Sequence, residues 1–148
     1  MKNKLLKTLI GVVILLVSIS CKVEPEAIEY GKDQCSFCKM NVVDKTHSAQ
    51  YVTKKGKQFK FDAIECMVNE LSEKEIEKIG ILLVSDYQLP GQMTSALDAT
   101  YLISKEIKSP MGANLSAFKS AQIANTTKIE RGGELYPWIQ LLEKFDAK

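Results

Sequence analysis

The sequence is poor in histidine and has no excess of charge of one sign. Each of these features argues against a class of function. His47 is the only histidine, and no Ser-His-Asp arrangement, glycine-rich phosphate loop or pair of carboxylates at catalytic spacing is evident. Beyond residues 1–20, the chain carries 17 Lys and Arg against 18 Asp and Glu, which gives no electrostatic basis for nucleic-acid binding. The sequence therefore predicts a non-enzymatic protein with no nucleic-acid partner.

The apolar run at the N-terminus is too short to cross a membrane as a helix. Residues 9–17 number nine, whereas a spanning helix needs roughly 20. Three lysines precede the run, and Ser20-Cys21 follows it in a pattern that resembles the lipobox of bacterial lipoproteins. We expect residues 1–20 to be a lipoprotein signal peptide and Cys21 to carry the lipid (palmitate), with a plain secretory signal or an N-terminal membrane anchor as alternatives.

This interpretation places the protein in the cell envelope, anchored by lipid on the non-cytoplasmic side of a bacterial membrane. The polar residues 21–32, which include Pro25, are then expected to be the acylated cysteine and a flexible tether. With Cys21 acylated, three free cysteines remain: Cys35, Cys38 and Cys66. An odd number of cysteines outside the cytoplasm argues against a purely structural disulfide framework.

Two thiols and a thioether lie within six residues, at Cys35, Cys38 and Met40. Such soft ligands select Cu(I), Zn(II) or iron–sulfur clusters over hard cations, and the thioether favours monovalent copper. A disulfide or redox pair is the alternative for the Cys-x-x-Cys spacing. A thioredoxin-like motif opens a helix after a strand, whereas this one follows the expected tether.

Other residues could complete a metal site. Met111 lies in a Pro-Met-Gly loop, and Met93 in a polar stretch is a weaker candidate. His47 lies nine residues after Cys38, and its imidazole suits copper or zinc. Cys66 is interpreted first as a small buried hydrophobe, although Cys35, Cys38, His47 and Cys66 together could form a Cys3His zinc site.

The pattern of apolar residues predicts an α+β fold made of two small β-β-α-β units. In the first, strands at 48–53 and 58–61 flank a turn, and a helix capped by Asp62 carries Ile64, Met67, Val68 and Leu71 on its apolar face. Gly80 is expected to end the helical stretch, before a buried strand at 81–85.

The second unit begins after a turn expected at Pro90-Gly91. It has a strand at 99–104, a loop at 109–114, a short strand or helix start at 115–118, a helix at 118–127 and a turn at 131–134. Pro137 is expected in the first turn of a final helix. That helix is predicted to bury Trp138, Ile139, Leu142 and Phe145.

Several of these motifs, taken in order, resemble the NosL family. They are the lipoprotein signal, Cys38-Lys39-Met40, Asp44, His47, Ala49-Gln50, Phe61-Asp62-Ala63, Asp98-Ala99, Pro110-Met111-Gly112 and Gly132-Gly133. The similarity spans roughly residues 30–135. Many family members have only the second cysteine, so Cys35 is a departure from the pattern.

The resemblance implies an outward-facing accessory lipoprotein that binds Cu(I) and delivers it for assembly of the copper centres of nitrous oxide reductase. The implied partners are the reductase and the membrane copper-loading machinery, and residues 33–148 would be the copper-binding domain. Cys38, Met40, His47 and Met111 would lie near or in the copper site. The alternatives are a structural zinc or Cys-x-x-Cys redox module, and a copper buffer or sensor with no delivery partner.

Overall fold

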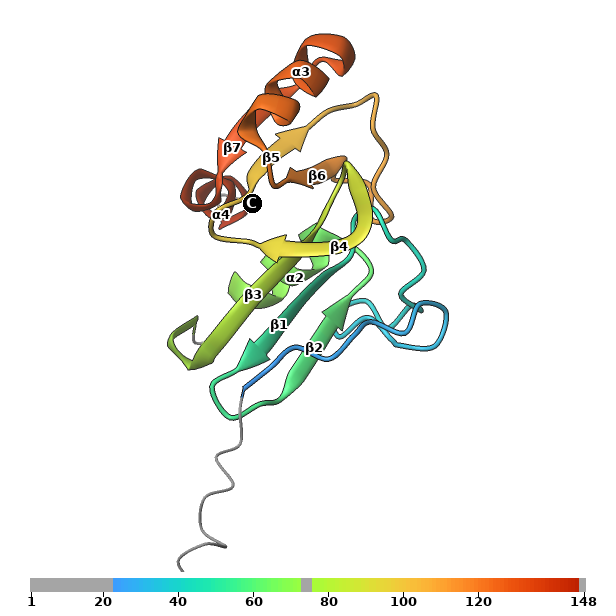
Figure 1. Ribbon diagram of the computed structural model, residues 1–148, viewed down its shortest axis with the longest axis vertical. Helices are drawn as coiled ribbons and strands as arrows, with labels where there is room; N and C mark the ends of the chain where they lie inside the picture. The colour runs from blue at the N-terminus through green and yellow to red at the C-terminus, as the bar shows by residue number, and fades with distance from the viewer. Residues whose placement is uncertain (1–22, 73–75, 147–148) are drawn as a thin grey trace, which may run out of the picture.

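The computed structural model describes residues 23–72 and 76–146, and it contains two antiparallel sheets with helices packed against them (Figure 1). The first sheet has the order β2-β1-β3-β4 and the second the order β6-β5-β7. The strands of the first are β1 (Ala49–Thr53), β2 (Gln58–Phe61), β3 (Ile79–Asp86) and β4 (Leu89–Ser95). Those of the second are β5 (Thr100–Ile103), β6 (Leu115–Phe118) and β7 (Glu134–Pro137).

The two predicted β-β-α-β units are confirmed. Helix α2 (Ile64–Ser72) and the short 3-10 helix η1 (Ile76–Lys78) lie between β2 and β3, and α3 (Ala121–Arg131) lies between β6 and β7. In each unit the first strand is central, with the second and third strands on either side of it. The second unit ends in α4 (Trp138–Asp146).

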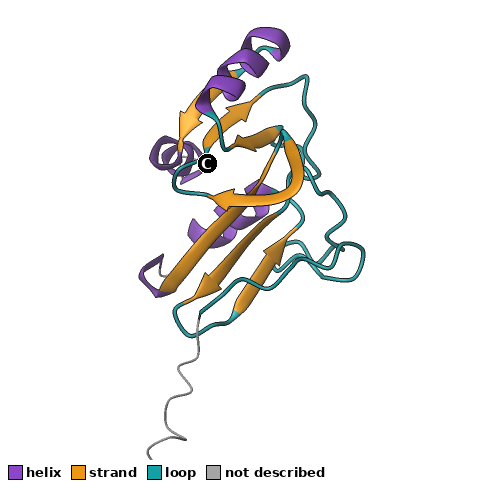
Figure 2. Cartoon of the chain, in the orientation of Figure 1, coloured by secondary structure: helices purple, strands orange, loops and turns teal. Residues whose placement is uncertain are grey.

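Helix α2 joins the two units through one hydrophobic core. Its residues Ile64, Met67, Val68 and Leu71 are all buried, as their helical spacing predicts. They share a core with Tyr51 and Phe61 of the first sheet and with Tyr101, Leu115 and Ala117 of the second. Figure 2 shows α2 against one face of the four-stranded sheet, on the side that also meets the second unit. Helix α2 therefore packs against both units along its length.

The Pro90-Gly91 pair is not the predicted turn. Both residues lie in β4, and the turn that joins β3 to β4 is at residues 87–88. β4 is an edge strand that pairs only with β3 within the first sheet, and an edge position tolerates proline because it needs no backbone donor on its outer side. Because its residues are mostly polar and exposed, the pattern of apolar residues does not predict this strand.

The predicted boundaries near Gly80 and Pro137 are also wrong. Gly80 lies inside β3, and Pro137 is the last residue of β7, directly before α4. In α4, Trp138 is buried as expected, whereas Ile139 is exposed and Leu141 is buried in its place. Leu142 and Phe145 are partly buried and pack against the core.

The stretch expected as a tether runs beside β2 where the structure describes it. The backbone carbonyls of Glu24 and Ala27 accept hydrogen bonds from the side chains of Gln58 and Lys60, at 2.9 and 2.8 Å. Lys60 also forms a 2.7 Å ion pair with Asp33. These contacts fix the chain that leads into the cysteine motif against the edge of the first sheet.

Candidate metal centre

The Cys-x-x-Cys motif forms a tight loop attached to β2. The Cys35 amide donates to the Met40 carbonyl at 2.7 Å, and the Lys39 amide donates back to the Cys35 carbonyl at 3.0 Å. Lys39 completes the turn with a φ of 66°, in the left-handed region. The Ser36 amide donates to the Lys60 carbonyl at 2.8 Å, which fixes the loop to the strand.

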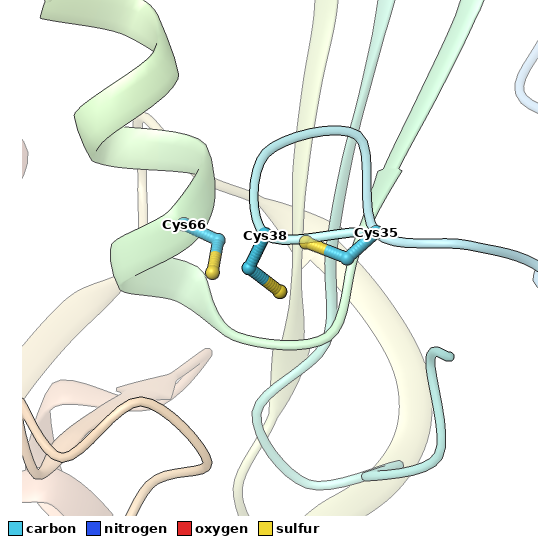
Figure 3. Close-up of side chains that lie close together, drawn as sticks. All are labelled: Cys35, Cys38 and Cys66. Atoms are coloured by element: carbon cyan, nitrogen blue, oxygen red, sulfur yellow. The ribbon is translucent and has the colours of Figure 1, made fainter. Parts of the chain in front are cut away.

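Cys66 joins the two cysteines of the loop from the first turn of α2. The sulfur atoms of Cys35, Cys38 and Cys66 all lie within 4.8 Å of one another. Figure 3 shows the three side chains gathered between the loop and the start of the helix. Cys35 and Cys66 are buried, Cys38 is partly exposed, and all three are free thiols. The chain therefore holds a preformed three-sulfur cluster.

The cluster stabilises one thiolate. The Cys66 thiol donates a hydrogen bond to Cys35, and the backbone amides of Cys38, Asp62 and Phe37 also point at this sulfur; together they lower the pKa of Cys35 to about 5, against the effect of burial. The hydrogen bond to Cys35 and burial raise the pKa of the Cys66 thiol. Burial raises the pKa of Cys38, opposed in part by the Met40 amide. Of the three sulfurs, that of Cys35 is therefore the one whose thiolate the fold favours most.

Asp62 supports this loop rather than capping α2 as the sequence predicted. Its carboxylate Oδ1 accepts the backbone amides of Val43 at 2.7 Å and of Asp44 at 3.1 Å. Its own amide is one of the donors to Cys35. Asp62 therefore connects the end of β2, the segment after the cysteine loop and the sulfur of Cys35.

The two candidate methionines, Met40 and Met111, are exposed, at 56% and 44%. Met40 follows Cys38 in the same loop, and its amide points at the Cys38 sulfur. Met111 lies in the loop between β5 and β6. That loop is tied to α2 because the Glu65 carboxylate accepts the Ser109 hydroxyl and, at 3.3 Å, the Ala113 amide. Glu65 precedes Cys66, so the Met111 loop is anchored at the same end of the helix as the cluster.

His47 lies outside the three-sulfur cluster, so the Cys3His alternative is not the arrangement found. Its Nδ1 lies 2.9 Å from the carboxylate of Asp44, and its Nε2 lies 3.2 Å from the hydroxyl of Ser116. Among the described residues, the group that could hold a metal contains the three cysteines and not His47. Both ring nitrogens already have partners, and a role as a ligand would require one of these bonds to break.

Asp44, His47 and Ser116 follow the hydrogen-bonding order of a catalytic triad, which the sequence did not suggest. Ser116 is fully buried on β6 and His47 is 4% exposed. A nucleophile must reach its substrate, and this hydroxyl is sealed within the protein. The three residues instead connect the segment before β1 to the second sheet.

The remaining sequence candidates lie elsewhere. Met93 is on β4, where it lines a hollow of about 340 Å³ together with Ile28 and Leu83, none of which belongs to the cysteine cluster. Cys21 falls outside the described residues. Within the described part of the chain, no helix is sufficiently long and apolar to span a bilayer.

Cys66 is buried in the core, as the sequence first indicated, but its sulfur also lies beside those of Cys35 and Cys38, which the sequence did not predict as its first interpretation. The sequence held one signal for this. Cys66 lies at the start of the predicted helix, a few residues after the strand at 58–61, and the cysteine loop is attached to that strand. Periodicity places Cys66 on α2, but only the packing of the loop against that helix shows that its thiol faces the other two.

Comparisons with known proteins agree on one family. The NosL family model matches residues 27–144. Among solved structures, the crystal structure of the copper chaperone NosL from Shewanella denitrificans superposes with a TM-score of 0.70 at 19% sequence identity. The match covers 79% of this chain and 94% of the Shewanella chain. No curated protein matches the sequence.

Proposed function

Because the chain belongs to the NosL family, we propose that it binds Cu(I) at Cys35, Cys38 and Cys66 and delivers it for assembly of the copper centres of nitrous oxide reductase. The observation that carries the proposal is the convergence of three sulfur atoms within 4.8 Å from two separate segments. The NosL family is non-enzymatic and is linked to the assembly of that reductase. The sequence-based expectation of a protein that is not an enzyme is therefore confirmed by membership of the family.

The ligand chemistry favours Cu(I) over zinc. Thiolates bind both ions, but structural zinc sites are almost always closed with four ligands. Within the described residues the cluster offers three, and no histidine or carboxylate belongs to it. The nearest residue along the chain that could add a soft ligand is Met40, and Met111 is brought to the same end of α2 by Glu65. We assign these thioethers an accessory role and His47 a structural one.

The cluster is suited to transfer as well as to storage. Two of its thiols are buried while Cys38 is partly exposed, so an incoming ligand can reach the metal from one side. A site of low coordination also lets a new ligand bind before an old one leaves. The lipid anchor proposed at Cys21 would hold this site on the outer side of the membrane, where the reductase and its copper-loading machinery would receive the metal.

An anaerobic Cu(I) titration against a chromophoric chelator tests the binding site. The full-length chain is compared with Cys35→Ser, Cys38→Ser, Cys66→Ser and Met111→Leu, with Ser36→Ala as a control in the same loop. We expect one tightly bound Cu(I) per chain, strong weakening by Cys35→Ser and Cys66→Ser, and no change from Ser36→Ala. A parallel titration with zinc that shows the tighter binding would instead support a structural zinc module.

Delivery is tested separately from binding. The copper-loaded protein is mixed anaerobically with copper-free nitrous oxide reductase and the membrane copper-loading machinery, and the absorption of the reductase's copper centres is followed. Faster formation of the centres than with an equal amount of chelated Cu(I) supports delivery. Equal rates would indicate a copper buffer or sensor with no delivery role.

A further inference from the structure

The three sulfur atoms of the cluster differ in how they are held. Cys35 is fully buried, and its sulfur receives three backbone amides as well as the Cys66 thiol. Cys66 is 1% exposed and lies on α2. Its amide is bonded to the Ala63 carbonyl at 3.1 Å, so its backbone is fixed by the first turn of the helix. These two sulfurs form an inner pair that joins the loop to the helix.

Cys38 is held less firmly. It lies on the tip of the loop, between exposed Phe37 and Lys39, and Lys39 has the left-handed φ of 66°. Its sulfur interacts with the other two sulfurs and with the backbone amide of Met40, whereas three backbone amides point at the sulfur of Cys35. It is the one cysteine of the three that solvent reaches. Sequence spacing pairs Cys35 with Cys38, whereas the interior of the protein pairs Cys35 with Cys66.

We propose that Cys35 and Cys66 are the holding ligands for the metal and that Cys38 is the exchange ligand, the first to leave when an acceptor takes the copper. This division of roles rests on the function proposed above. The acceptor is a protein that presents a thiol. Its sulfur forms a bond to copper, the bond from copper to Cys38 breaks, and the acceptor's thiol proton ends on Cys38. Copper remains Cu(I) throughout, and no electron is transferred.

Exposed apolar side chains flank the exchange ligand. Phe37 and Met40, on either side of the Cys38-Lys39 pair, are 39% and 56% exposed. They give the acceptor an apolar surface around the partly exposed sulfur. Water displaced from that surface would leave the transferring Cu(I) in contact with sulfur ligands from both proteins.

Alkylation of the copper-loaded full-length chain with iodoacetamide, read by peptide mass spectrometry, tests this order without any substitution. We expect Cys38 to be modified at least about tenfold faster than Cys35 or Cys66, because thiol reactivity requires access. We also expect copper to remain at one per chain after Cys38 is blocked. Modification of Cys66 or Cys35 first, or loss of copper in step with Cys38 modification, would overturn the proposal.

Serine variants separate this inference from the proposed function. We expect Cys38→Ser to keep one Cu(I) per chain at equilibrium with a chelator that the wild type also withstands, but to exchange that Cu(I) faster than the wild type, because the position for the incoming ligand is already open. We expect the matched variant Cys66→Ser to lose the copper to the same chelator. Equal loss in both variants contradicts the division of roles, while failure of the wild type to bind Cu(I) contradicts the function itself.

Discussion

At the scale of single residues, Cys35 is the cysteine whose surroundings most favour metal binding, because they stabilise its thiolate. Four hydrogen bonds converge on its sulfur, one from a neighbouring thiol and three from the backbone. A thiolate is the form that binds metal. Because the folded chain lowers the pKa of Cys35, less free energy is needed to deprotonate this thiol when the metal binds.

The depressed pKa of Cys35 makes the stability of the metal-free protein depend on pH. The pKa is about 5 in the folded chain, against an ordinary value of 9.0. The contribution is therefore full above pH 9, where both states are deprotonated, and is lost as pH falls from 9 towards 5, because the unfolded chain binds the extra proton. Denaturant unfolding under reducing conditions should show the free energy of unfolding rising with pH across this range.

Cys35→Ser is the control for this pH dependence. In this variant the free energy of unfolding should rise less between pH 5 and pH 9. The ultraviolet absorbance of one thiolate per chain at neutral pH should also disappear. An unchanged pH dependence in Cys35→Ser would show that this sulfur is not the stabilised thiolate.

Lys39 carries backbone strain that glycine would relieve. Its φ of 66° lies in the left-handed region, which costs an L-residue roughly 1–2 kcal/mol. Lys39→Gly should raise the free energy of unfolding by about 0.5–1 kcal/mol after the greater freedom of glycine in the unfolded chain is deducted. Asn114→Gly, at a φ of 56°, is the control and should gain less, because asparagine tolerates this region. Destabilisation by Lys39→Gly would mean that the side chain itself holds the turn.

At the scale of secondary-structure elements, the sequence located the parts whose signals are local. The strand at 58–61 follows from alternation and the apolar face of α2 from helical spacing, and both are found; the segment 115–118, left open between a strand and a helix start, is β6. β4 escaped detection because an edge strand needs neither an apolar face nor a full set of donors. The buried face of α4 was predicted wrongly, with Ile139 in place of Leu141. In so short a helix, the apolar residues fit two different faces equally well.

The close approach of β5 and β7 depends on Gly133. A Cβ added there would lie 2.2 Å from the carbonyl oxygen of Ile103, and its φ is +101°. Gly133→Ala should destabilise the protein by at least about 1–3 kcal/mol, because the backbone of the pair must move apart. Gly132→Ala is the matched control: its φ is +66° and its ψ is −172°, with nothing within 4 Å, so it should lose only the backbone strain of about 1–3 kcal/mol, and Gly133→Ala should lose more. Equal losses in thermal or denaturant unfolding would contradict this account.

At the scale of the whole molecule, the candidate site depends on contacts between segments far apart in the sequence. The cysteine loop alone provides two sulfurs, and the third comes from α2, which is clamped between the two units. Sequence spacing showed that soft ligands were present but not that Cys66 joins them or that His47 does not. Tertiary packing decides both, and no local pattern encodes it.

The bond between His47 and Ser116 joins the two units away from the sulfur cluster. It connects the segment before β1 to β6, and Ser116 is fully buried. Ser116→Ala should therefore lower the free energy of unfolding by about 1 kcal/mol, the usual net value of such a hydrogen bond. Cu(I) affinity should not change. A loss of copper affinity that exceeds the loss of stability would restore His47 to the ligand set.

The most direct test of the three-sulfur site is X-ray absorption spectroscopy of the Cu(I)-loaded full-length chain beside its Cys66→Ser variant. We expect Cu(I) in an environment of sulfur alone, with three sulfur ligands in the wild type and fewer in the variant. Nitrogen or oxygen ligands in the wild type, with a coordination shell that Cys66→Ser leaves unchanged, would contradict it and place the metal elsewhere in the chain.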